Sequence, residues 1–127
     1  MLYRNILLVD DDVDDTQLFL EALKSMQTAA VYRTVSNPKT ALAELRTAEE
    51  LPDLIFLDYN MPMINGLDFL KQMKLEKKLE QIEVVLISTP PEEFMYAWLK
   101  KNDISVEYIP KPDNFDEIKA MFRRFVK

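Results

Sequence analysis

The chain has 127 residues, of which 48% are hydrophobic and 30% charged, and its formal net charge is −6. This length suits one domain with a buried core, and the composition is that of a folded protein rather than a disordered one. The acidic balance argues against a nucleic-acid partner, because such binding relies on basic side chains that neutralise phosphates.

The sequence contains no Cys and no His. Disulfides, zinc sites of thiolates or imidazoles, cysteine nucleophiles and Ser-His-Asp triads are therefore excluded. Any bound metal must have oxygen ligands, which favours Mg²⁺ or Ca²⁺. The apolar runs are far shorter than the ~20 residues that cross a bilayer, and the N-terminus lacks a signal-peptide pattern. We expect a cytoplasmic protein without a membrane partner.

Short apolar runs alternate along the chain with longer amphipathic segments. The runs predict strands at Asn5–Val9, Val31–Val35, Leu54–Leu57, Val84–Ile87 and Val106–Ile109. Helical spacing of apolar residues follows each strand, at residues 18–26, 41–45, 67–75, 94–99 and 118–125. A strand and a helix repeated five times predict an α/β fold, a doubly wound five-stranded parallel sheet with right-handed crossovers.

Chemically useful side chains follow four of the predicted strands. Ligands of doubly wound sheets bind beyond the carboxyl ends of the strands, so these side chains are expected to converge at one edge. The strand-end groups are Asp10-Asp11-Asp12, Asp58, Ser88-Thr89 and Pro110-Lys111-Pro112.

The acidic run Asp10–Asp15 allows two interpretations that the sequence disfavours. A calcium-binding EF-hand loop nearly fits from Asp10 to Glu21, but Asp15 occupies the place that requires Gly, and the loop would follow a strand. An aspartate-nucleophile phosphohydrolase of the haloacid dehalogenase kind also has aspartates after its first strand. Here, however, Asp14 occupies the place of its Thr or Val, and the chain is short for that class.

Four motifs taken together point to a known family. LLVDDD, DLIFLDYNMPMINGLDFL, VVLIST and YIPKP closely resemble, in order and spacing, the receiver domain of two-component response regulators. The resemblance covers essentially the whole chain and implies a flavodoxin-like (βα)5 fold, with residues 1–127 as a single stand-alone domain. It implies a protein that accepts a phosphoryl group from a sensor histidine kinase or a phosphotransfer protein. Such a protein is not an enzyme with a separate substrate, although passing the phosphoryl group onward in a phosphorelay remains an alternative.

The resemblance assigns roles to the residues that match the motifs. Asp58 matches the phosphoacceptor, whose carboxylate forms an acyl phosphate. Asp10 and Asp11 match the acidic pair that holds one Mg²⁺ ion together with Asp58, and Asn60 is expected to contribute its backbone carbonyl.

The remaining roles concern the phosphoryl group and its read-out. Lys111 matches the lysine that pairs with the phosphoacceptor and then with a phosphoryl oxygen, and the Lys111–Pro112 bond is expected to be cis. Ser88 matches the switch hydroxyl, and Tyr108 matches the aromatic residue that follows its movement. An unknown downstream protein is expected to bind the face of the fourth helix, fifth strand and fifth helix, where Tyr96 is the candidate surface residue.

Other residues of these motifs favour structural roles. Asp12, Asp14 and Asp15 are expected to cap N–H groups and complement the dipole at the start of the first helix. Gly66, the only glycine, is expected where the backbone needs a positive φ or where another part of the chain approaches closely.

Two places depart from the family pattern. Thr89 stands where a smaller residue is usual, and Asn102 is expected to supply the left-handed end of the fourth helix.

Overall fold

The computed structural model describes residues 2–61, 64–88 and 92–126, with the backbone alone for Ser88 and residues 92–95. The elements alternate from strand to helix along the chain. They are β1 (Asn5–Val9), α1 (Val13–Ser25), β2 (Val31–Val35), α2 (Pro38–Thr47), β3 (Leu54–Asp58), α3 (Gly66–Lys74), β4 (Glu83–Ser88), α4 (Glu92–Lys101), β5 (Glu107–Pro110) and α5 (Phe115–Arg123). No helix among these is long and apolar enough to cross a membrane.

The five strands form one parallel sheet in the order β2-β1-β3-β4-β5. The chain therefore starts near the middle of the sheet and winds first to one edge and then to the other, as the doubly wound prediction requires. Two predicted strands, β1 and β2, have the predicted bounds, and β5 begins one residue later than predicted. The predicted fold class is confirmed.

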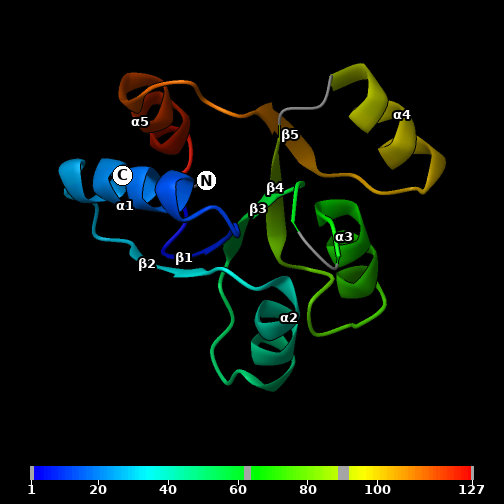
Figure 1. The fold of residues 1–127 in the computed structure, drawn as a ribbon. Helices are drawn as coiled ribbons and strands as arrows, with labels where there is room; N and C mark the ends of the chain where they lie inside the picture. The colour runs from blue at the N-terminus through cyan, green and yellow to red at the C-terminus, as the bar shows by residue number, and fades with distance from the viewer. Residues whose placement is uncertain (1, 62–63, 89–91, 127) are drawn as a thin grey trace.

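Helices cover both faces of the sheet (Figure 1), with α1 and α5 on one side and α2 and α3 on the other. Side chains alternate along each central strand, so β3 sends Phe56 into the layer under α1 and α5 and Leu57 into the opposite layer. All five residues of β3 are buried. Burial on both faces explains why the central strands are apolar runs without polar alternation.

Aromatic rings fill the layer between the sheet and α5. Phe122 lies edge-on to Phe56, with ring centroids 5.1 Å apart, and edge-on to Phe19 of α1, at 5.9 Å. Phe125 makes a similar contact with Phe56 at 5.4 Å. These edge-to-face contacts add to the area that the rings bury and fix α1 and α5 against β3.

Asparagine and aspartate side chains begin four of the helices. Asp12, Asn37, Asn65 and Asn114 cap α1, α2, α3 and α5 by accepting hydrogen bonds from backbone N–H groups of the first turn. At the end of α4, the left-handed residue is Asp103, with φ of 56°, and not Asn102 as expected. The Asn102 side chain instead donates to the carbonyl of Trp98, which keeps it within the last turn.

Gly66 begins α3 against the end of β3, and it does not have a positive φ. A Cβ atom at this position would lie 2.8 Å from the Asp58 carbonyl oxygen, 2.9 Å from Leu86 Cδ1 and 2.9 Å from Tyr59 Cα. Two of these three atoms belong to the backbone and cannot rotate away. Of the two expected reasons for this glycine, close approach is therefore the one that applies.

We expect Gly66→Ala to destabilise the protein by about 1–3 kcal/mol, because the added methyl group overpacks a rigid site. The measurement is urea unfolding followed by circular dichroism. Lys71→Ala serves as the control, since Lys71 is an exposed residue of the same helix. A Gly66→Ala variant as stable as the Lys71→Ala variant would contradict the close-approach explanation.

Candidate functional site

Two carboxylates are buried where neighbouring strands end. Asp10 follows β1 and Asp58 ends β3, the strand paired with β1, and each side chain is only 4% exposed. Asp11 joins them, and one carboxylate oxygen from each of the three lies within 4.8 Å of the others. The structure thus brings together three of the residues predicted to hold a metal.

The buried carboxylates have only part of their hydrogen-bonding capacity filled by the protein. The backbone N–H of Asp12 donates to Asp10 Oδ1 over 2.9 Å, and the backbone N–H of Asn60 donates to the Asp58 carboxylate. Within the described part of the chain, Asp58 Oδ1 is the one buried side-chain oxygen or nitrogen without a hydrogen-bond partner. A buried anionic oxygen without a donor is costly, so this atom marks where a cation or ligand fits.

Burial and like charge disfavour ionisation at this edge. Burial raises the pKa of Asp58 to about 7, with the nearby Asp10 carboxylate as the second cause, while Lys111 and the Asn60 N–H act in the opposite direction. Burial likewise raises the pKa of Asp10. The oxygen ligand set fits a hard divalent cation such as Mg²⁺, whose charge would favour both ionised carboxylates.

Lys111, after β5, supplies the cation of the site. Its Nζ lies 3.7 Å from Asp10 Oδ2 and 3.7 Å from Asp58 Oδ1, but only 2.5 Å from Asp15 Oδ2. Burial lowers the pKa of Lys111, yet the Asp15 hydrogen bond and the charges of Asp10 and Asp58 outweigh it, so the pKa is raised and the ammonium persists. The lysine is within ion-pair distance of Asp58, as predicted, but its closest partner is one that the sequence analysis assigned elsewhere.

The aspartates of the acidic run that follows β1 have different structural roles. Asp12 Oδ1 accepts from the N–H groups of Asp14 and Asp15, so Asp12 alone caps α1. Asp14 and Asp15 lie in the first turn as expected, but Asp15 also forms the ion pair with Lys111. Because α1 begins at Val13, no calcium-binding loop extends from Asp10 to Glu21, and the structure rules out that interpretation.

The other predicted residues are placed less completely. Tyr108 is buried beside the exposed Tyr96, with ring centroids 6.2 Å apart. Ser88 ends β4 opposite Pro110, but its side chain lies outside the described part of the structure, as does the whole of Thr89. The carbonyl role of Asn60 and the switch roles of Ser88 and Tyr108 therefore stay predictions.

The expectation of a cis Lys111–Pro112 bond is wrong. The described residues contain no cis peptide bond, and these two residues are among them. The trans form is the ordinary one, since it is favoured by about 0.5–1 kcal/mol before proline.

Comparison with known proteins defines the family. The family model described as the response regulator receiver domain matches residues 6–123. This chain therefore belongs to the response regulator receiver domain family. Its parallel sheet and its carboxylates at the strand ends fit the phosphoacceptor role that receiver domains have in two-component signalling.

Solved structures of response regulators are similar over nearly the whole chain. The phosphorylated cyanobacterial phytochrome response regulator RcpA is 29% identical, with a TM-score of 0.82, over 96% of this chain and 90% of RcpA. The Mn²⁺-bound form of the response regulator Rcp1 is 26% identical, with a TM-score of 0.79, over 95% of this chain and 90% of Rcp1.

A curated relative is much longer than this chain. The protein-glutamate methylesterase/protein-glutamine glutaminase of Hydrogenovibrio crunogenus is 32% identical over 108 residues. The match covers 84% of this chain but 27% of the relative, so the chain spans about a quarter of that protein's length. The similarity therefore concerns only that part of the relative, and the enzyme activity in its name belongs to the whole of that longer protein.

The raised pKa of Asp58 predicts a loss of stability as pH rises. The Asp58 carboxyl binds a proton more tightly in the folded state than in the unfolded chain, where its pKa is near 3.8. The proton on Asp58 therefore stabilises the folded state fully below pH 4. That stabilisation disappears as pH rises through about 7. Without divalent cations, we expect the free energy of unfolding to fall over this range by about 4 kcal/mol more than in Asp58→Asn, since each unit of pKa difference corresponds to about 1.4 kcal/mol.

The measurement is urea unfolding at intervals between pH 4 and pH 8 in the presence of EDTA. Asp68→Asn, which changes an exposed aspartate of α3, should follow the wild-type curve. Parallel curves for the wild type and Asp58→Asn would show that burial does not raise the pKa of this carboxyl.

Proposed function

We propose that this protein is a single-domain response regulator that takes a phosphoryl group onto Asp58 from a histidine kinase or a histidine phosphotransfer protein. One observation carries the proposal. Asp58 is a buried carboxylate with an unpartnered oxygen, beside two further carboxylates and within 3.7 Å of the Lys111 ammonium. The similarity to the response regulators RcpA and Rcp1, over 90% of each of those chains, supports the proposal.

The chemistry proposed for Asp58 is nucleophilic. An oxygen of the ionised carboxylate attacks the phosphorus of a phosphohistidine, a P–O bond forms, and the P–N bond breaks with its electron pair returning to the imidazole. Lys111 then donates to a phosphoryl oxygen and offsets the added negative charge. The protein catalyses transfer to, and hydrolysis from, its own aspartate and is not an enzyme acting on a separate substrate.

Asp10, Asp11 and Asp58 are proposed to hold one Mg²⁺ ion, with the Asn60 backbone carbonyl as a further ligand. Their oxygens cluster within 4.8 Å, and carboxylate oxygens are the ligands that this ion prefers. Bound Mg²⁺ would neutralise the negative charge that develops between the phosphoryl group and the carboxylate. The raised pKa values of Asp10 and Asp58 are consistent with a site that is completed by a cation.

The output is proposed to pass through protein contacts in the cytoplasm. Ser88 would reach toward the phosphoryl group, and Tyr108 would follow it by changing its packing against Tyr96. The buried Tyr108 contacts the exposed Tyr96 on α4, so movement of one ring alters the surface next to the other. The face of α4, β5 and α5 is therefore the proposed surface for an unknown downstream partner.

Acetyl phosphate and Mg²⁺ provide a test that needs no kinase. We expect intact-protein mass spectrometry to detect one added phosphoryl group, which hydroxylamine removes because it is an acyl phosphate. Asp58→Asn should carry no adduct, whereas Asp68→Asn should be labelled like the wild type. An unlabelled wild type, or an adduct that persists in Asp58→Asn, would refute the proposed function.

Mg²⁺ should stabilise the protein by mass action, by about 2.7 kcal/mol when its concentration is 100 times the dissociation constant. We expect thermal unfolding at pH 8 to shift to higher temperature with MgCl₂, and to shift much less at pH 5. The proton on Asp58, whose pKa is raised to about 7, competes with the metal. Asp11→Asn should remove most of the shift, and equal shifts in this variant and the wild type would contradict the proposed ligand set.

A further inference from the structure

The closest anionic partner of Lys111 is not a buried carboxylate of the site but Asp15, in the first turn of α1. Its Oδ2 lies 2.5 Å from Lys111 Nζ, compared with 3.7 Å for the nearest oxygens of Asp10 and Asp58. Lys111 and Asp15 are joined by a hydrogen bond between charged groups, whereas the two longer contacts are ion pairs beyond hydrogen-bond range. Lys111 is therefore held by Asp15 and only attracted by the other two.

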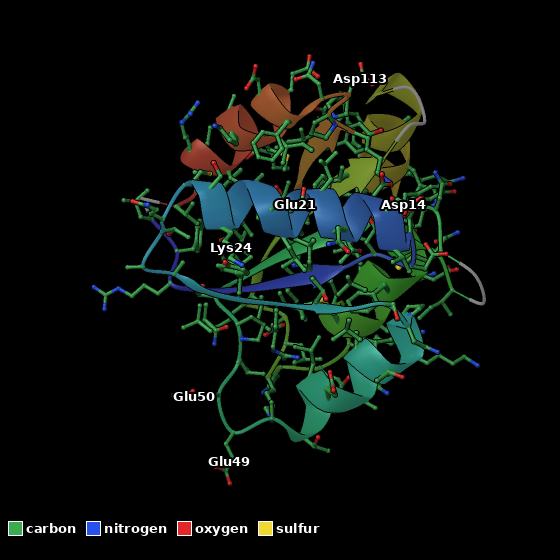
Figure 2. All side chains as sticks on the ribbon, turned by 60° about the vertical axis from the view of Figure 1, so that its left-hand side comes forward. Asp14, Glu21, Lys24, Glu49, Glu50 and Asp113 are labelled. Atoms are coloured by element: carbon green, nitrogen blue, oxygen red, sulfur yellow. The ribbon has the colours of Figure 1, made fainter. Side chains whose placement is uncertain are left out.

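The start of α1 leaves the Asp15 carboxylate available for this contact. Asp12 Oδ1 already accepts from the N–H groups of Asp14 and Asp15, so the helix is capped without the Asp15 side chain. Asp14, on the same turn, is exposed to solvent, and Figure 2 shows it at the N-terminal end of α1. Asp15 is half-buried and directed at Lys111. Two adjacent aspartates of one turn thus have different surroundings.

The position of Lys111 determines whether it can donate a hydrogen bond to Asp58. Asp58 Oδ1 is buried without a hydrogen-bond partner, although the ammonium is only 3.7 Å away. The ammonium has three N–H donors, so it can serve Asp15 and a second acceptor together only where Nζ is within hydrogen-bond distance of both. At 3.7 Å from Asp58 Oδ1 it is not, so Nζ must move before it can donate to Asp58 or to a phosphoryl group on it, and the bond to Asp15 opposes that movement.

We propose that Asp15 is a positioning residue that holds the Lys111 ammonium away from Asp58 and thereby lowers the affinity of the site for a phosphoryl group. The proposal rests on the proposed function of Asp58 as phosphoacceptor and adds a residue that sets the strength of the site. Asp15 contacts neither Asp58 nor the phosphoryl group, and it acts through Lys111.

The test is the affinity for beryllium trifluoride, a phosphoryl analogue, measured by ¹⁹F NMR at saturating Mg²⁺. Asp15→Asn keeps the shape of the side chain and removes its charge, so Lys111 should move to the analogue. We expect binding to tighten by about threefold to tenfold, the effect of releasing one hydrogen bond of ordinary strength at a partly exposed ion pair. Asp15→Glu keeps the carboxylate within reach of Lys111 and should bind like the wild type.

Two comparisons separate positioning from a general effect of charge. Asp14→Asn removes the same charge from the same turn of α1. The described ion pairs of Lys111 are with Asp10, Asp15 and Asp58 and not with Asp14. This variant should therefore change the affinity for the analogue less than twofold. In a Lys111→Gln background, at higher fluoride concentrations, Asp15→Asn should have no further effect, because the residue through which Asp15 acts is gone.

The outcomes are distinguishable. No change or weaker binding in Asp15→Asn would overturn the proposal, as would equal tightening in Asp14→Asn or tightening that persists without Lys111. Circular dichroism checks that each variant folds, and Asp15→Ser replaces Asp15→Asn if the latter unfolds. A wild type that binds no analogue and forms no acyl phosphate would instead refute the proposed function of Asp58.

Discussion

The structure depends on the burial of two carboxylates side by side at the ends of paired strands. Asp10 and Asp58 are each 4% exposed, and burial raises the pKa of both. Such an arrangement opposes folding unless protons or cations are present. One side chain, Lys111, supplies a positive charge within 4 Å of both, and a divalent cation would supply more. The folded protein is therefore most stable when a proton or a cation is bound at this pair of carboxylates.

The sheet is what keeps these charges together. Every residue of β3 is buried, and the strand pairs with β1 on one side and with β4 on the other. Apolar contacts on both faces hold the strands in register, so the ends of β1 and β3 cannot separate to relieve repulsion without exposing the core. Gly66 tightens this end further, because α3 starts in direct contact with the Asp58 carbonyl. The favourable packing of the core thus offsets the repulsion between the two carboxylates.

Much of this arrangement follows from the sequence because it depends on local patterns. Apolar runs predicted the strands to within a residue or two, and strand-end positions predicted that Asp10, Asp11, Asp58 and Lys111 converge. What the sequence did not predict depends on side-chain geometry between elements. Asp15 was assigned to the helix start because its position in the first turn explains an acidic residue on its own. Its contact with Lys111 joins residues nearly a hundred positions apart, and no local pattern encodes that distance. The left-handed residue after α4 was misplaced by one position for a local reason, since the Asn102 side chain bonds back to the carbonyl of Trp98 in the last turn and Asp103 takes the left-handed conformation.

The charges near Lys111 would allow a single ammonium to serve the site both at rest and with the proposed phosphoryl group on Asp58. In the resting arrangement it touches Asp15 and lies equally far from Asp10 and Asp58, so three carboxylates share it. A phosphoryl group on Asp58, as proposed, would add negative charge beside an oxygen that Lys111 does not yet contact closely, and the balance of attraction would shift toward it. If Asp15 positions Lys111 as proposed, the lysine cannot follow that shift without loosening its bond to α1. The start of α1 and the end of β5 would then respond together to what is bound at Asp58, through one hydrogen bond and no rearrangement of the sheet.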